Sequence, residues 1–174
     1  RLIAVDENGR EVDGDEIIFI IARELLKKGK LNKKKVVCTV LSNMGVERNL
    51  NSMGVSMLRV DVGDHNVQAA MAKGGYVLGG EQSGHIIFRD FASTGDGQLT
   101  AIQLLSVMKR SGKKLSELAE LMERYPQVMI NVKISTRWKE AWKNIPEIEE
   151  MIENKEKELD GSGRILVRES GTEP

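Results

Sequence analysis

Three short polar loops contain the residues of this chain that could bind a ligand or take part in chemistry. The first, residues 79–85 with the sequence GGEQSGH, lies between the apolar runs YVL and IIF. A carboxylate offers two acceptor oxygens, a serine hydroxyl can donate and accept, and glycines let a ligand approach the backbone. That mixture suits the vicinal hydroxyls of a sugar, although a glycine-rich turn between apolar runs is commonly an ordinary hairpin. Residue type alone leaves both interpretations open.

The other two polar loops suggest anion binding. Residues 93–97 (STGDG) come directly before a predicted helix, whose N-terminus would favour an anion. Capping of that helix is the simpler interpretation. Residues 168–174 (RESGTEP) combine an arginine, which can bind phosphate through two parallel hydrogen bonds, with neutral donors from serine, threonine and glycine backbone. This composition fits a phosphate-binding loop better than a plain turn.

The histidines and the cysteine differ in their sequence surroundings. His85 belongs to the first polar loop, so a ligand contact and a structural role are equally open to it. His65 lies at a predicted helix start, where its protonated form could stabilise an anion. Cys38 lies in the apolar run VVCTV without a neighbouring histidine, which predicts a buried strand residue and not a reactive thiol. The sequence contains no metal-ligand cluster, Walker loop or dinucleotide fingerprint.

Composition and charge disfavour several classes of partner. The 174 residues include 26 basic and 26 acidic side chains, a balance that gives no global attraction to nucleic acid or anionic membrane. No apolar run approaches the roughly 20 residues that span a bilayer. A single cysteine suits a reducing cytosol. We therefore expect a cytoplasmic protein with a small-molecule substrate and no nucleic-acid or membrane partner, and the abrupt ends at Arg1 and Pro174 suggest a fragment.

Alternating strands and helices must position the polar loops. Asp13 is expected to cap a helix together with Glu16, and that helix should end near Gly29. Because the first polar loop joins two strands directly, part of the sheet should be antiparallel. Short connections between the elements argue for a layered α/β domain. The other expected elements are strands at 2–5, 36–40 and 55–60 and helices at 46–53, at 67–73, near 115–122 and near 99–108, the last with Leu99, Ile102, Leu105 and Met108 on its apolar face.

A second domain is expected after Tyr125-Pro126, because proline ends the preceding helix. The alternation of apolar residues over 128–134 is typical of a half-buried strand. A charged helix should start at Pro146 and continue to about Glu158, followed by a strand at 165–167. The expected domains are an α/β domain over 1–124 and part of a smaller α+β domain over 125–174.

The order of the polar motifs resembles that of the α-D-phosphohexomutases along the whole chain. GGEQSGH, then Asp90 and TGDG, a helix pair and finally RESGTEP carry the resemblance. In that family GE(x)SGH is the sugar-binding loop of the third of four domains, and Gln82 is similar to the residue of the phosphoglucosamine branch. The resemblance implies a layered mixed-sheet third domain followed by a truncated fourth domain.

The resemblance also implies roles for individual residues. It places no catalytic residue in this chain, because the family's phosphoserine and the aspartates of its metal loop DGDxDR lie upstream. Arg1 would be the last residue of that metal loop. Sugar contacts would come from Glu81, Ser83, Gly84 and His85, with His65 and Gln82 as further candidates, and contacts to the non-reacting phosphate from Arg168, Ser170, Gly171 and Thr172.

The implied reaction interconverts glucosamine 6-phosphate and glucosamine 1-phosphate. A serine phosphate carrying Mg²⁺ would pass to the sugar to give glucosamine 1,6-bisphosphate, and the other phosphate would return to serine. The product would feed UDP-N-acetylglucosamine and cell-wall synthesis, and the full-length enzyme could be a homodimer. This chain alone would be inactive. A glucose- or mannose-phosphate mutase of the same family and a non-catalytic sugar-phosphate binding protein are the alternatives.

Two residues depart from the family pattern. His65 stands where the family often has arginine or lysine, which implies a weaker and pH-dependent phosphate contact. Glu169 stands where proline is expected, and its carboxylate should point away from a bound phosphate because it would repel it. Both departures leave room for a different substrate or for weaker binding.

Overall fold

The computed structural model describes residues 1–135 and 141–169. The chain divides into two compact units, Arg1–Pro126 and Gln127–Pro174. The first unit contains the first two polar loops, and the second unit contains the third.

A four-stranded mixed sheet forms the centre of the first unit, with the strand order β4-β3-β5-β6. β3 (Lys35–Thr39) runs parallel to β4 (Ser56–Val60) and to β5 (Leu78–Gly80). β6 (Ile86–Phe88) is antiparallel to β5, with Gly79 opposite Ile87. The predicted mixed α/β sheet, antiparallel where the first polar loop joins two strands, is confirmed.

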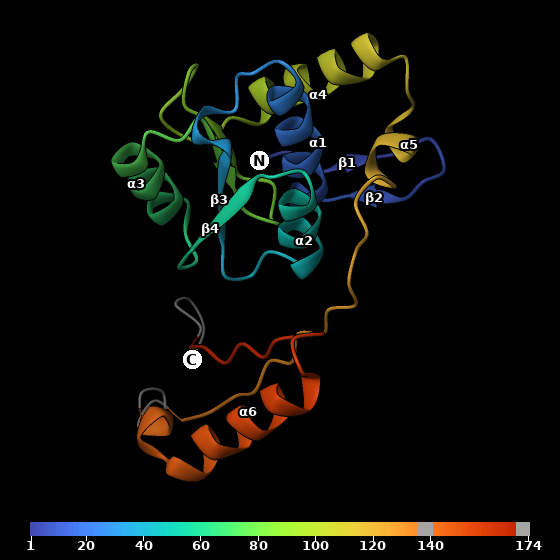
Figure 1. Ribbon diagram of the computed structural model, residues 1–174. Helices are drawn as coiled ribbons and strands as arrows, with labels where there is room; N and C mark the ends of the chain where they lie inside the picture. The colour runs from blue at the N-terminus through green and yellow to red at the C-terminus, as the bar shows by residue number, and fades with distance from the viewer. Residues whose placement is uncertain (136–140, 170–174) are drawn as a thin grey trace. The chain divides into compact units, whose positions relative to one another are not determined.

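Helices cover both faces of this sheet. α1 (Gly14–Lys27) and α2 (Met44–Ser52) lie on one side, and α3 (Asp64–Gly74) lies on the other (Figure 1). Successive side chains of a strand point to opposite faces. In β3 the residues therefore alternate between two cores: Val36 and Cys38 join the larger core and Val37 the smaller core under α3. Cys38 is fully buried, as predicted.

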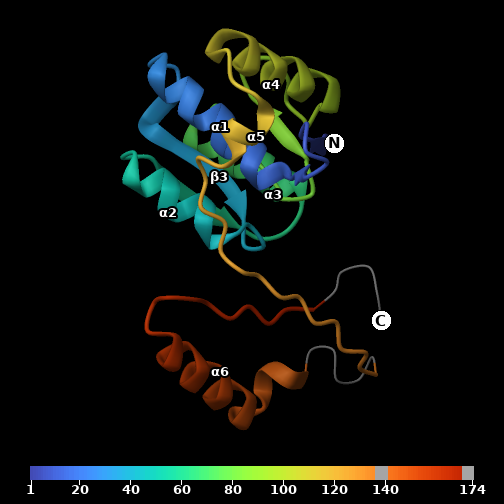
Figure 2. The same ribbon diagram turned by 90° about the vertical axis from the view of Figure 1, so that its right-hand side faces the viewer.

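Two further helices complete the first unit on the side of α1. α4 (Gly97–Ser111) packs on α1 and β6, and α5 (Leu115–Ala119) packs on α1 (Figure 2). The predicted apolar face of α4 is right in part, since Leu99 and Met108 pack against the core. Ile102 and Leu105 are 61% and 60% exposed, whereas Leu104 and Val107 are buried. The spacing of apolar residues in α4 fits more than one face, and the positions of α1 and β6 select which one is covered.

The first unit begins with a small hairpin that leads into α1. β1 (Ala4–Val5) pairs antiparallel with β2 (Glu11–Val12). Asp13 then caps α1, accepting hydrogen bonds from the N–H groups of Asp15 and Glu16 at 3.0 and 3.2 Å. The Glu16 carboxylate in turn accepts from the Asp13 N–H at 3.3 Å. The predicted capping box is confirmed.

The described part of the second unit contains two helical segments, the short η3 (Ala141–Asn144) and α6 (Pro146–Leu159). α6 confirms the predicted charged helix. The strands predicted at 128–134 and 165–167 are wrong, since no strand is assigned among the described residues of this unit. Alternating apolar and polar residues favour an extended strand, but a strand is part of a sheet only where a neighbouring strand forms hydrogen bonds with it. Val128 and Ile130 are instead 84% and 79% exposed.

Candidate functional site

The first polar loop lies at the carboxyl ends of the parallel strands. β5 ends at Gly80 and continues directly into Glu81, while the neighbouring parallel strands β3 and β4 end at Thr39 and Val60. In open α/β sheets, ligands bind outside the carboxyl ends of the strands. The topology therefore brings residues 81–85 close to residues 63–65, which follow β4.

Glu81 is the most constrained polar side chain of this region. Its residue is only 7% exposed, and its Oε1 accepts a hydrogen bond from the Gly63 N–H at 3.0 Å. Gly63 has a φ of +126°, a backbone conformation that residues with a side chain rarely adopt. The other carboxylate oxygen, Oε2, lies 3.6 Å from Nδ1 of His85. Glu81 thus presents a fixed carboxylate beside an imidazole.

His85 lies between two acidic side chains. Its Nδ1 is 3.6 Å from Glu81 and 3.9 Å from Oδ2 of Asp64, and its side chain is 26% exposed. Both distances exceed hydrogen-bond lengths, so the attraction depends on protonation of the imidazole. His65 is at the edge of this group, 77% exposed, with Nδ1 4.0 Å from Oδ1 of Asp64. The structure therefore brings Glu81, His85 and Asp64 together, with His65 adjacent.

The glycines of the loop serve close packing within the protein. Gly84 has a φ of +87°, and a Cβ there would lie 2.1 Å from the Leu2 carbonyl oxygen. The Gly84 carbonyl accepts from the Leu2 N–H at 2.9 Å. A Cβ on Gly80 would lie 2.4 Å from the His85 carbonyl oxygen, and one on Gly79 would lie 2.7 Å from Met71 Sδ. Close contacts within the protein thus require glycine at these positions, and their role in ligand approach stays a prediction.

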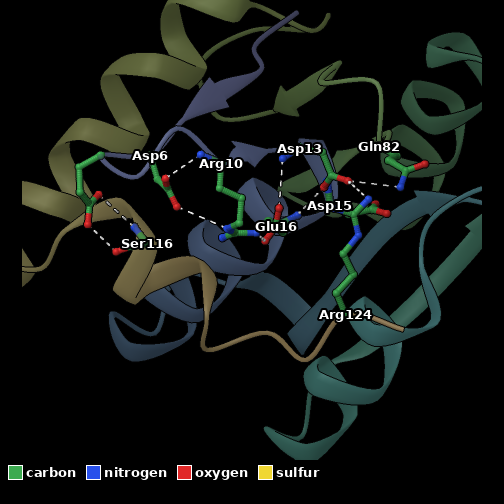
Figure 3. Close-up of polar contacts among 9 residues, drawn as sticks. Asp6, Arg10, Asp13, Asp15, Glu16, Gln82, Ser116 and Arg124 are labelled. Carbon is green, nitrogen blue, oxygen red and sulfur yellow. Dashed lines mark hydrogen bonds and ion pairs between the residues drawn. The ribbon is translucent and has the colours of Figure 1, made fainter. Parts of the chain in front are cut away.

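The two side chains at the turn have different surroundings. Ser83 is exposed. Gln82 donates its Nε2 to Oδ2 of Asp13 at 3.3 Å, and the same carboxylate forms an ion pair with Arg124 at 3.2 Å (Figure 3). The Gln82 amide nitrogen is thus directed into the protein, toward the start of α1.

The second polar loop caps α4, as its simpler interpretation predicted. Oδ1 of Asp96 accepts from the N–H groups of Gln98 and Leu99 at 2.8 and 3.0 Å. The loop also lies against the candidate site. A Cβ on Gly95 would lie 3.0 Å from Cδ2 of His85, and one on Gly97 would lie 2.2 Å from the Arg1 carbonyl oxygen. The beginning of the chain, the first polar loop and the second polar loop are therefore neighbours.

Burial raises the pKa values of two groups of the first unit, Asp15 on α1 and Cys38 on β3. Burial raises the pKa of Asp15 to about 6, although the Asn43 N–H, which donates to its carboxylate at 2.8 Å, and the Ser42 hydroxyl act in the opposite direction. Burial also raises the pKa of the Cys38 thiol far above its usual range. Cys38 is therefore a structural residue, in agreement with its prediction.

The third polar loop is described only in part. Arg168 is exposed, and its Nη1 donates to the Glu169 carbonyl at 3.2 Å. The Glu169 carboxylate forms an ion pair with Lys143 at 2.7 Å, so it faces a cation of its own unit. Ser170, Gly171 and Thr172 lie outside the described residues. The predicted phosphate-binding set stays a prediction.

Metal binding and membrane insertion can be considered for the described residues only. Among residues 1–135 and 141–169, no group of three or more His, Cys, Asp or Glu side chains could hold a metal ion. These residues do not fit an Mg²⁺ site, and we assign them no metal-dependent step. None of the helices described in the structure is long and apolar enough to cross a membrane.

Three contacts of the site were missed by sequence reasoning. They are the hydrogen bond from the Gly63 N–H to Glu81, the approach of Asp64 to His85, and the link from Gln82 through Asp13 to Arg124. Asp13 and Gln82 are 69 residues apart in sequence. The capping box explained Asp13 completely at the local level, so no signal in the sequence pointed to its second partner.

Comparison with known proteins relates both units to one family. Residues 13–125 match the family model described as phosphoglucomutase/phosphomannomutase, alpha/beta/alpha domain III, and residues 129–174 match its C-terminal domain. The phosphoglucosamine mutases of Thermoanaerobacter sp. (strain X514) and Streptococcus agalactiae serotype Ia are 55% and 53% identical over the whole chain. The chain spans 39% of the length of each of these relatives.

Solved structures agree with this relationship. The Aspergillus fumigatus N-acetylphosphoglucosamine mutase in complex with GlcNAc-6P and magnesium has a TM-score of 0.74 at 18% identity, covering 98% of this chain and 41% of that chain. A phosphoglucomutase/phosphomannomutase family protein from Burkholderia thailandensis has a TM-score of 0.64 at 26% identity, covering 71% of this chain and 27% of its own. The fold class expected from the sequence is confirmed. The chain belongs to the phosphoglucomutase/phosphomannomutase family.

Proposed function

We propose that this chain is the substrate-recognising part of a phosphosugar mutase that interconverts glucosamine 6-phosphate and glucosamine 1-phosphate. The observation that carries the proposal is the buried Glu81 carboxylate, held by the Gly63 N–H at 3.0 Å and facing His85 at 3.6 Å. The identity of more than half to phosphoglucosamine mutases supports the amino sugar as substrate. The remainder of the catalytic machinery belongs to the longer protein.

Sugar recognition is assigned to the first polar loop. Glu81 supplies acceptor oxygens for sugar hydroxyls, and the exposed Ser83 hydroxyl can donate and accept. His85 lies beside the sugar, with the Gly84 backbone in contact, while His65 is a candidate at the edge. A carboxylate that is already fixed loses little conformational freedom when it binds, which favours accurate orientation of the substrate.

Phosphate recognition is assigned to the third polar loop. Arg168 would grip the non-reacting phosphate through two parallel hydrogen bonds, since guanidinium and phosphate match in geometry. Neutral donors would complete the cradle. The bisphosphate intermediate must bind in two orientations, with either phosphate at the third polar loop. Contacts of the first polar loop with the hydroxyls between the two phosphates can form in both orientations. The neutral donors are assigned to Ser170, Gly171 and Thr172.

Residues of the longer protein would perform the phosphoryl transfer. A phosphoserine would donate the phosphoryl group, giving glucosamine 1,6-bisphosphate as the intermediate, and Mg²⁺ would neutralise charge on the transferred group. Arg1 would be the last residue of the metal loop and would lie next to the second polar loop, where its carbonyl approaches Gly97. The magnesium in the Aspergillus fumigatus relative supports this assignment. We place the enzyme in the cytoplasm, where the buried thiol of Cys38 would stay reduced.

Substitutions in the first polar loop of the full-length protein test the proposal. Glu81→Gln removes the carboxylate charge and should lower kcat/KM for glucosamine 6-phosphate about 100-fold, because hydrogen bonds to charged groups are the strong ones. Ser83→Ala should lower it about tenfold. Turnover is measured with Mg²⁺ on glucosamine 6-phosphate, glucose 6-phosphate and mannose 6-phosphate.

Ser52→Ala is the matched control, because Ser52 is an exposed serine at the end of α2. It should leave kcat/KM unchanged. Wild-type turnover in folded Glu81→Gln and Ser83→Ala variants would refute the assigned site. A wild-type preference for glucose or mannose phosphate would keep the family and refute the amino sugar. No turnover of any of these sugars by a serine-phosphorylated protein would favour a sugar-phosphate binding protein.

A further inference from the structure

One carboxylate, that of Asp13, connects the candidate sugar loop to two other parts of the first unit. Its Oδ1 caps α1 through the N–H groups of Asp15 and Glu16. Its Oδ2 accepts from Gln82 at 3.3 Å and pairs with Arg124 at 3.2 Å. Figure 3 shows the Asp13 carboxylate in contact with the Gln82 amide and the Arg124 guanidinium. The two oxygens therefore serve different purposes.

The contact is specific because the Asp13 carboxylate is buried and can only accept. The Asp13 side chain is 7% exposed, so water competes little for Oδ2. A carboxylate fixes which end of a carboxamide faces it, and the Gln82 nitrogen is turned inward. The backbone reinforces the same attachment, since the Gly14 N–H donates to the Gln82 carbonyl at 2.9 Å. Gln82 is thus held by both its side chain and its main chain.

Gln82 also lies between the two residues assigned to the sugar. Glu81 precedes it and Ser83 follows it, so a displacement of Gln82 moves both neighbours. The Glu81 carboxylate already has its own support from Gly63. Ser83 is exposed, and the backbone on its two sides is fixed by the attachment of Gln82 and by the hydrogen bonds of Gly84 with Leu2 and Glu81.

We propose that Asp13 is a positioning residue for the sugar-binding loop and that Gln82 acts through Asp13 and not through its own contact with the substrate. The loop is anchored by the Asp13 Oδ2–Gln82 Nε2 hydrogen bond, with Arg124 balancing the buried charge. This inference rests on the proposed function of the loop. The residue at position 82 then affects substrate binding because it attaches the sugar-binding loop to Asp13.

An exchange of donor and acceptor in the full-length protein tests the inference. Gln82→Glu keeps the size of the side chain but sets a second carboxylate against Asp13. It should lower kcat/KM for glucosamine 6-phosphate about tenfold or more. Adding Asp13→Asn restores a donor–acceptor pair with reversed polarity and keeps an oxygen for the cap, because asparagine caps helices as well as aspartate. The double variant should recover most of the lost kcat/KM.

A second readout does not depend on activity. Amide hydrogen exchange at Glu81 and Gly84, whose N–H groups donate to the carbonyls of His85 and Glu81, reports directly on the loop. Exchange there should accelerate in Gln82→Glu and slow again in the double variant, while exchange in β3 stays unchanged. Inactivity of the wild type would refute the proposed function. The exchange data would still show whether the Asp13–Gln82 hydrogen bond anchors the loop.

Glu24→Gln is the matched control, since Glu24 also lies on α1 and pairs with an arginine, Arg110, at 3.1 Å on α4. It should change neither loop exchange nor kcat/KM. If loop exchange slows again in the double variant but kcat/KM does not recover, the Gln82 amide itself contacts the ligand and the inference is wrong. If neither quantity recovers, the Asp13–Gln82 pair does not position the loop and the inference is also wrong. Unchanged loop exchange in Gln82→Glu would overturn it as well.

Discussion

Three acidic side chains at the N-terminus of α1, its cap and two residues of its first turn, show that local partners set the free-energy cost of burying a charge. Asp13, Asp15 and Glu16 are all buried. Glu16 is compensated by Arg10 at 2.7 Å and Asp13 by its cap and ion pair (Figure 3). Among the described residues, neutral donors of Asn43 and Ser42 act on the Asp15 carboxylate, and the charge of Arg59 offsets the effect of burial only in part. Burial without a cation in contact favours the protonated acid, so Asp15 is the residue whose charge costs stability.

Asp15 should make the wild type lose stability as the pH rises. Its pKa is about 6 in the fold against an ordinary value of 3.8, so the stabilising protonated form is present at low pH and is lost as the pH rises through about 6. The difference of about two pH units corresponds to roughly 3 kcal/mol. The free energy of unfolding of Asp15→Asn and of the wild type is measured by urea titration. The value for the variant minus the value for the wild type should therefore increase between about pH 4 and pH 7. A pH-independent difference between the two proteins would contradict this assignment.

At the scale of elements, the N-terminus of α1 and the first polar loop form one packed unit. Gly14 is the first residue of α1, and a Cβ there would lie 2.2 Å from the Glu81 carbonyl oxygen and 2.7 Å from the Gly84 nitrogen. These are backbone atoms, which cannot rotate away as a side chain can. Close approach of helix and loop therefore requires glycine at this position.

Gly14→Ala should be severely destabilising for this reason. The added methyl group meets backbone on several sides, so overpacking should cost about 3 kcal/mol or more. Gly112→Ala is the comparison: Gly112 has a φ of +66° with open space around it, so only backbone strain of about 1–2 kcal/mol is expected. Urea unfolding of both variants measures the difference. A smaller loss for Gly14→Ala than for Gly112→Ala would show that the helix and loop can separate at little cost.

At the scale of the whole molecule, the two units differ in how their apolar residues are covered. The first unit buries Ile17, Ile18 and Val36 completely. Residues 127–135 of the second unit are exposed and without assigned secondary structure, although Val128 and Ile130 are apolar. Segments with few buried contacts and no ladder hydrogen bonds open at little cost in free energy.

Limited proteolysis of this chain should therefore cut first within residues 127–135. Thermolysin, which cleaves before apolar residues, should find Val128 and Ile130 accessible and should leave Arg1–Pro126 intact. Mass spectrometry of the early products identifies the cleavage sites. Initial cleavage before the buried Ile17 or Ile18 in α1 would instead indicate that the first unit is the less stable one.

Local sequence chemistry predicted the features that depend on near neighbours. The Asp13–Glu16 capping box, the burial of Cys38 and the start of a helix at Pro146 were all correct, because each depends on residues within one or two turns. The apolar face of α4 was predicted correctly at Leu99 and Met108 and wrongly at two other positions. Spacing indicates that a helix has an apolar face, but Ile102 and Leu105 are exposed because α1 and β6 lie against another side.

The sequence by itself determined the alternation of strands and helices in the first unit, the polar loops and the family resemblance, since these depend on residue type and spacing along the chain. Only the tertiary structure decided how the loops are assembled: that Gly63 supports Glu81, that Asp64 approaches His85, and that Asp13 holds Gln82. The physical reason is sequence distance. The contacts of Gly63 and Asp64 arise when parallel strands align their carboxyl ends in a sheet, and that of Asp13 arises when the start of α1 packs against the loop after β5. No local pattern encodes which distant groups will then meet.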